Sequence, residues 1–102
     1  MAVFKNITAE GVTTIVSKNQ YQNKGDVVFD TINISNNSPT NSVTISLQLW
    51  DGDSTGYNII GNVRIPAGTA LMLNDGLKFN NRIYNLRTET TGTSPIVDII
   101  IS

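Results

Sequence analysis

The sequence contains no cysteine and no histidine. Without cysteine, disulfides, thiol nucleophiles and thiolate metal sites are excluded, and the chain fits a protein assembled in a reducing cytoplasm. Without histidine, imidazole-based catalytic dyads and triads and the common zinc sites are excluded as well. The reactive groups that remain are carboxylates, hydroxyls and amines.

Clustered charge and long apolar runs are also scarce. Seven Lys and Arg against eight Asp and Glu give a formal net charge of −1, and the cations are scattered along the chain. Because nucleic-acid binding needs a basic patch, nucleic acid is not an expected partner. Residues 1–11 hold no signal-peptide core and no run of about 18 apolar residues occurs, so we expect neither export nor a membrane span.

What the chain does contain is alternation of apolar and polar residues. Residues 42–50 have aliphatic side chains at every second position, a period of two that predicts a half-buried strand. Residues 27–35 alternate similarly, with Val28, Ile32 and Ile34 expected on one face. The polar segment 36–41 supplies turn residues between the two runs. We therefore predict an antiparallel hairpin over residues 27–50.

Turns rich in Gly, Pro and Asn separate the other predicted strands, which cover residues 3–8, 12–17, 57–65, 69–73, 82–90 and 96–101. No segment has apolar residues at helical spacing over three turns. A length of 102 residues fits one domain, placed at residues 1–102. We expect an all-β fold, a single antiparallel β-sandwich of roughly seven or eight short strands, with jelly-roll or immunoglobulin-like connections.

The last predicted strand is apolar on both of its faces. Ile96 and Ile100 alternate with Val97, Ile99 and Ile101. A strand of this kind is buried on both sides, so in a two-layer sandwich its second face needs a cover. The residues leave two alternatives open: a loop of the same chain, or the interface with another subunit. The Leu-Met-Leu run at residues 71–73 poses the same question.

Residues 51–56 resemble the opening of a calcium-binding loop. Asp51, Asp53 and Thr55 supply oxygens at alternate positions, followed by Gly56. Asn62 stands where the bidentate acid of such a loop is needed, so the match fails there. We interpret the segment as an ordinary polar hairpin turn, with adventitious cation binding as the alternative. No metal site and no cofactor is predicted.

Glycosidase chemistry needs two carboxylates flanking a bond, and nothing in the sequence selects such a pair. Asp98 is the most unusual acid because it lies inside an apolar strand, and we expect it at a sheet edge or paired with an arginine. No catalytic residue, no enzymatic activity and no small-molecule substrate is predicted. The acids considered were Asp26, Asp30, Asp51, Asp53, Asp75, Glu89 and Asp98.

Three aromatic residues, Trp50, Tyr57 and Tyr84, could stack on a sugar or on a partner. Trp50 falls on the polar face of its strand, where we expect it to pack against neighbours. Trp50 and Tyr57 flank the 51–56 loop, which makes a carbohydrate- or receptor-binding module the alternative function. No other binding residue is identified.

Four short motifs resemble small virion structural proteins of tailed bacteriophages of the marine and cyanobacterial type. The motifs are ISNNS at residues 34–38, VTISL at 43–47, VRIPAG at 63–68 and VDIIIS at 97–102. The resemblance covers residues 27–102. It implies a non-enzymatic component of the head, neck or tail of the virion, assembled in the host cytoplasm. Its partners would be copies of itself, in a homo-oligomer, and other virion proteins.

Overall fold

Ten antiparallel strands in three sheets make up the protein, as seen in a computed structural model that describes residues 2–20, 26–74 and 76–102. No helix occurs in these ranges, so none there has the length and apolarity needed to cross a membrane. The all-β class and the antiparallel sandwich are confirmed, with slightly more strands than the sequence predicted.

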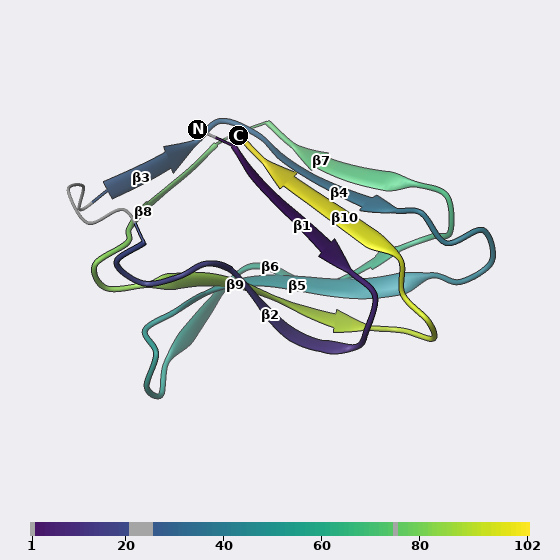
Figure 1. Ribbon diagram of the computed structural model, residues 1–102, viewed down its shortest axis with the longest axis horizontal. Coiled ribbons are helices and arrows are strands. Elements are labelled where there is room, and N and C mark those ends of the chain that lie inside the picture. Colours follow the sequence, from purple (N-terminus) through teal and green to yellow (C-terminus); the bar gives the residue numbers. More distant parts are fainter. Residues whose placement is uncertain (1, 21–25, 75) are drawn as a thin grey trace.

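Two four-stranded sheets face each other as layers, and a two-stranded ribbon lies at one end (Figure 1). The first sheet has the order β1 (Val3–Ile7), β10 (Val97–Ile101), β4 (Ile32–Asn36) and β7 (Ala70–Leu73). The second has the order β2 (Gly11–Val16), β9 (Asn85–Thr91), β5 (Val43–Trp50) and β6 (Gly56–Ile65). The ribbon pairs β3 (Asp26–Phe29) with β8 (Leu77–Asn80).

The chain passes from one large sheet to the other at almost every connection. The β5–β6 hairpin is the exception, because both of its strands lie in the second sheet. β3 interrupts the crossing from β2 to β4, and β8 interrupts the crossing from β7 to β9. Pairing between β3 and β8 therefore ties two crossings together at the same end of the sandwich.

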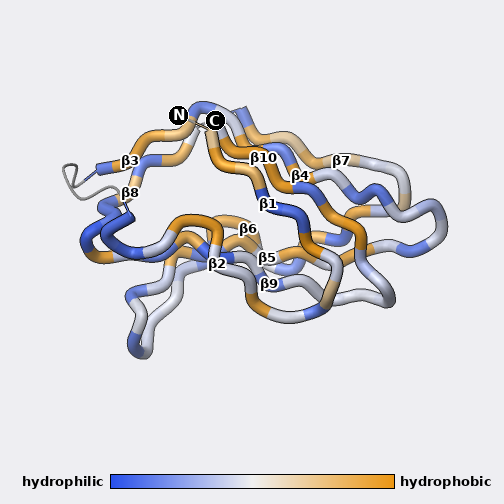
Figure 2. The backbone as a smooth tube through the Cα atoms, in the orientation of Figure 1, coloured by the Kyte–Doolittle hydropathy of each residue, from blue (hydrophilic) through white to orange (hydrophobic). Residues whose placement is uncertain are grey.

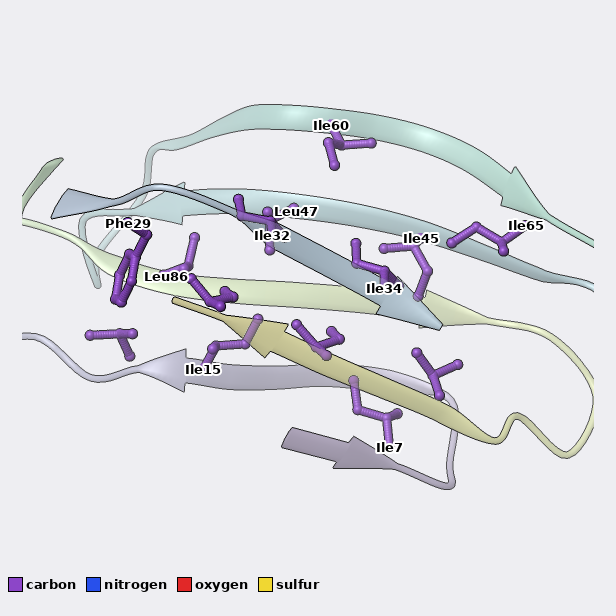
Figure 3. Packing of buried hydrophobic residues seen from close by; sticks show 14 of the residues in the cluster. Ile7, Ile15, Phe29, Ile32, Ile34, Ile45, Leu47, Ile60, Ile65 and Leu86 are labelled. Atoms are coloured by element: carbon purple, nitrogen blue, oxygen red, sulfur yellow. The ribbon is translucent and has the colours of Figure 1, made fainter. Parts of the chain in front are cut away.

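Inward-facing aliphatic side chains of both sheets form one core, as Figure 3 shows. Removing this apolar surface from water is the main force that holds the layers together. At the end closed by the ribbon, the rings of Phe29 and Phe79 lie 6.4 Å apart between centroids. Fully buried members of the core include Val16, Phe29, Ile34, Ile45, Leu47, Leu86, Val97, Ile99 and Ile101.

The predicted hairpin over residues 27–50 is wrong. Its first strand breaks at Asp30 and Thr31, whose backbone N–H groups both donate to the carbonyl oxygen of Ser102, at 2.7 and 2.9 Å. The break sends β3 into the ribbon and β4 into the first sheet, while β5 lies in the second sheet. The break also shifts the alternation of inward and outward residues. Val28 and Ile32, expected on one face, therefore differ: Val28 is 59% exposed and Ile32 is buried. The alternation of residues 27–35 does not indicate this break, because the break depends on hydrogen bonds to Ser102, which is distant in sequence.

The strand predicted at residues 82–90 begins later, at Asn85, because a turn precedes it. The backbone N–H groups of Ile83 and Tyr84 donate to the carbonyl oxygen of Asn80 at 3.1 and 3.0 Å. The preceding strand β8, which spans four residues and pairs with β3, was not predicted. The turn predicted at residues 74–76 includes Asp75, which lies outside the described residues.

Asn36 ends β4 and is buried, although the sequence placed it in a turn. Its side-chain amide donates to the carbonyl oxygens of Asn41 and Ile65, each at 2.9 Å. Its side-chain oxygen accepts the backbone N–H of Ser38 at 3.1 Å. One amide thus links β4, in the first sheet, to the end of β6, in the second.

Replacing Asn36 with alanine removes two donors and one acceptor from buried partners. We expect the free energy of unfolding to fall by about 2–4 kcal/mol, because buried polar groups left without a partner are costly. Urea denaturation followed by tryptophan fluorescence measures the loss. Asn33→Ala, on the same strand but facing outward, is the matched control and should cost less than about 1 kcal/mol. Equal losses in the two variants would contradict this role for Asn36.

Candidate functional site

The outward side of the β1–β10–β4–β7 sheet, here called the outer face, carries exposed apolar side chains. Along β10, Val97, Ile99 and Ile101 point inward and are fully buried. Just before β10 and within it, Ile96 and Ile100 remain 40% and 38% exposed. Within the described ranges, no loop buries these two side chains. Of the two alternatives that the sequence left open, a covering loop of the same chain is therefore not seen in those ranges.

Strand register aligns three of the exposed side chains across the outer face. Phe4 lies opposite Ile100, Ile100 opposite Asn33, and Asn33 opposite Met72. Phe4 is 68% exposed and Met72 is 59% exposed. Directly opposed residues in antiparallel strands share a face, so these residues form a row from one edge strand to the other. Figure 2 shows the hydrophobic residues that run along β10 and β7. We call Phe4, Ile100 and Met72 the apolar row.

Asp98 stands beside the apolar row, held by two side-chain amides. One carboxylate oxygen accepts from Asn6 at 2.7 Å and the other from Asn37 at 2.7 Å. The hydroxyl of Ser35 donates to the side-chain oxygen of Asn37 at 2.8 Å and steadies it. The expectation of an edge position or an arginine partner is wrong: β10 is an inner strand of its sheet, and both donors are amides. The donors are neutral, so the negative charge remains.

A shallow recess of about 300 Å³ opens next to this carboxylate, lined by Phe4, Lys5, Asn6, Asp98, Ile99 and Ile100. Lys5 lies on the edge strand β1 and is half-exposed. The ion pair recorded among the described residues joins Lys78 to Asp26 at 3.6 Å, on the distant ribbon, so neither Lys5 nor Asp98 takes part in one. Lys5 lies opposite the inward-facing Ile99, so its side chain leaves β1 on the side away from Asp98. The recess therefore combines the apolar surface of Phe4 and Ile100 with the carboxylate of Asp98.

The acids considered from the sequence are spread over separate elements. Asp26 is on β3, Asp30 follows it, Glu89 is on β9 and Asp98 is on β10. Among the described residues, no three carboxylates gather into a group that could hold a metal ion. Asp75 lies outside those residues. Only Asp51 and Asp53 remain neighbours, in the β5–β6 loop.

The Asp51 carboxylate organises the loop that contains it. One of its oxygens accepts the backbone N–H groups of Asp53, Ser54 and Thr55 at 2.8, 3.1 and 3.2 Å. These donors, with that of Asp53 the strongest and that of Thr55 next, hold the pKa of Asp51 below its ordinary value of 3.8. Asn62 bonds instead to Ser46, at 3.2 Å between its side-chain oxygen and the hydroxyl. Asp51 thus acts as a turn-forming residue.

Trp50 packs on the outer side of the second sheet, as its place on the polar face predicted. The guanidinium of Arg87 lies over its ring, 4.3 Å from the centroid. Arg87 is held in turn by Gln48, whose side-chain oxygen accepts from the guanidinium Nε at 2.9 Å. The Arg87 cation and the Trp50 ring are therefore already in a cation–π contact within the chain.

Tyr57 points to the opposite face of the same sheet. It lies opposite Leu49, which alternates with Trp50 along β5, so Tyr57 and Trp50 project to different sides. Its ring meets that of Tyr84 edge-on, 6.2 Å between centroids. The two aromatic residues that flank the 51–56 loop in sequence therefore do not form one binding surface.

Comparison with known proteins finds the fold but no family. Neither a protein-family model nor a curated protein matches the sequence. A chain from Bacillus endospore appendages, which form disulfide-linked pili, is 17% identical with a TM-score of 0.55, over 100% of this chain and 85% of that one. PirA is 15% identical with a TM-score of 0.57, over 98% of this chain and 91% of that one.

A chain of infectious bursal disease virus is 10% identical with a TM-score of 0.42, over 99% of this chain and 32% of that one. This likeness is too distant to support an inference. The pilus chain and PirA show a shared fold and leave the function open. None of the three bears on tailed phages, so that assignment stays a prediction.

Replacing Asp51 with asparagine keeps an acceptor for the loop but removes its charge. Because folding lowers the pKa of Asp51, its ionised form adds stability that is present above the ordinary value of 3.8 and lost as pH falls through the folded-state pKa. The wild type should therefore be more stable than Asp51→Asn at pH 7, and the difference should shrink as the pH falls below 3.8 and through the lowered pKa of the folded state. Urea denaturation along a pH series tests this. A difference that does not change with pH would contradict it.

Proposed function

We propose that this protein is a non-enzymatic structural building block that acts by assembling with copies of itself. The observation that carries the proposal is the row of Phe4, Ile100 and Met72, which stays exposed across the outer face with Asn33 between Ile100 and Met72. Burying apolar area stabilises by about 25 cal/mol per Å², so surface of this kind favours association. Exposed apolar side chains that lie next to each other, as Phe4 and Ile100 do, commonly mark interaction sites on soluble proteins.

The topology supports a structural role. Apart from the ribbon, eight strands form two sheets in the orders 1-10-4-7 and 2-9-5-6, with crossings between the sheets. We infer a jelly roll from this order, since an immunoglobulin sandwich of the constant type pairs sheets of four and three strands. Jelly rolls serve as capsid and lectin domains. The strand order therefore favours the first of the two topologies that the sequence left open.

The assembly we propose is the particle of a tailed phage, formed in the host cytoplasm with other virion proteins. The motifs at residues 34–38, 43–47, 63–68 and 97–102 support this location. In the structure, the second and fourth of these motifs supply core positions of β5 and β10, and the fourth also supplies Asp98 and Ile100 of the outer face. A carbohydrate- or receptor-binding module is less favoured, because Trp50 and Tyr57 face opposite ways.

Self-association is tested by native mass. Light scattering and sedimentation from about 10 μM to 1 mM should show a species larger than the monomer of 11.1 kDa, growing with concentration as interface contacts form. A mass that stays at the monomer throughout this range would overturn the proposal.

The phage location has its own test. Mass spectrometry of purified tailed-phage particles produced by a host that carries this gene should find the chain in many copies per particle. If the protein is oligomeric but absent from those particles, the building-block role is retained and the phage particle is rejected as its location.

A further inference from the structure

We infer that the recess beside Asp98 binds a single guanidinium group, the head group of arginine, with the Asp98 carboxylate as its anchor and the Phe4 ring as its stacking surface. This inference goes beyond the building-block role, because it concerns a small ligand site and requires no assembly. Three properties of the recess carry it: its charge, the fixed position of its carboxylate, and its aromatic wall.

Asp98 gives the recess a negative charge that no cation of the described residues neutralises. The other outward side chains on the four strands of the first sheet are apolar, amide or hydroxyl groups, and none of them is charged. Lys5 leaves β1 on the inward side, and the recorded ion pair of the described residues lies on the ribbon. A cation is therefore the ligand whose charge complements this recess.

The carboxylate of Asp98 is fixed by amides on both flanks of β10. Asn6 lies on β1 and Asn37 follows β4, and each donates to a different carboxylate oxygen at 2.7 Å. Because β1 and β4 pair with opposite edges of β10, the two amides hold the carboxylate from both sides. A group fixed in this way loses little conformational freedom when a ligand binds.

Both oxygens of this carboxylate can still accept a further hydrogen bond. Each oxygen has about two lone-pair sites, and the amide of Asn6 or Asn37 uses only one of them. Two acceptors at a fixed spacing match the parallel N–H donors of a guanidinium, which binds carboxylates through two hydrogen bonds at once. An ammonium is a point charge without such a fork, so it matches this pair of acceptors less well.

Phe4 supplies an aromatic wall to the same recess. It lies diagonally across the β1–β10 pair from Asp98, a spacing that an aromatic side chain can reach. The ring is 68% exposed, so it is available to a ligand. Guanidinium groups stack on aromatic rings, and on the second sheet Arg87 lies over the Trp50 ring in this way. The recess therefore offers both of the contacts that a guanidinium favours.

The volume of the recess limits the ligand to one such group. A volume of about 300 Å³ is at the lower end of the range for ligand pockets, and the recess is shallow. It therefore admits a head group of side-chain size and excludes most of an extended ligand. One partly exposed ion pair and one cation–π contact give weak binding, so we expect a dissociation constant in the millimolar range.

NMR titration with small probes at constant ionic strength tests the inference. Nα-acetyl-arginine amide should bind at one site and shift the side-chain amide signals of Asn6 and Asn37. Nα-acetyl-citrulline amide has nearly the same shape without the charge, and it should bind at least about threefold more weakly. Nα-acetyl-lysine amide keeps the charge without the fork, and it should also bind more weakly than the arginine probe.

Two variants with matched controls locate the site. Asp98→Asn removes the charge with little change of shape, and its affinity for the arginine probe should fall to that of the wild type for the citrulline probe. Asp53→Asn makes the same change at an exposed acid in the β5–β6 loop and should have no effect. Phe4→Leu should weaken binding by about two- to fivefold, because the ring is lost. Tyr57→Leu removes a ring that is 55% exposed on β6 and should not weaken it.

The outcomes are independent of the proposed function, which native mass decides. No shift at Asn6 and Asn37 with the arginine probe at up to about 100 mM overturns the site and leaves the building-block role intact. Equal binding of the citrulline or the lysine probe overturns guanidinium as the ligand. Binding that Asp98→Asn and Phe4→Leu leave unchanged places the probe elsewhere and overturns the recess. Phe4→Leu changes an exposed side chain, so it tests the recess even if Asp98→Asn disturbs the fold.

Discussion

Pairing of β10 on both of its edges is the interaction on which the first sheet depends. β1 and β4 flank this strand, so residues 3–7, 32–36 and 97–101 meet in one ladder. Its inward residues Val97, Ile99 and Ile101 are fully buried in the core. Ser102, immediately after it, bonds the backbone of Asp30 and Thr31 and thereby ends one strand and starts another.

The same strand also shapes the surface, because alternate residues of a strand point to opposite sides. The buried inward side chains anchor the backbone of β10 in the core, and that backbone places Asp98 and Ile100 on the outer face. The carboxylate is then positioned by amides from β1 and from the residue after β4. A charged and apolar surface built in this way requires little ordering when it binds.

The two outer surfaces of the sandwich differ in chemistry. On the second sheet, Gln48 joins Asn58 and Arg87 in a hydrogen-bonded row, and Arg87 covers Trp50, so these groups are satisfied within the chain. On the first sheet, Phe4, Ile100 and Met72 stay exposed, and the Asp98 carboxylate is bound by two neutral amides. The second sheet also exposes an apolar side chain, Val12, so the two surfaces differ in the row that the register aligns on the first sheet.

The sequence alone determined the all-β class and most strands, because alternation and turn residues are local properties. Its composition alone determined the lack of catalytic imidazole and thiol groups. Only the tertiary structure decided which strands share a sheet. It split residues 27–35, buried Asn36, separated Trp50 from Tyr57, and placed Phe4 opposite Ile100. The physical reason is that sheet hydrogen bonds join residues distant in sequence, and the register that aligns a surface row is set by packing of the whole core.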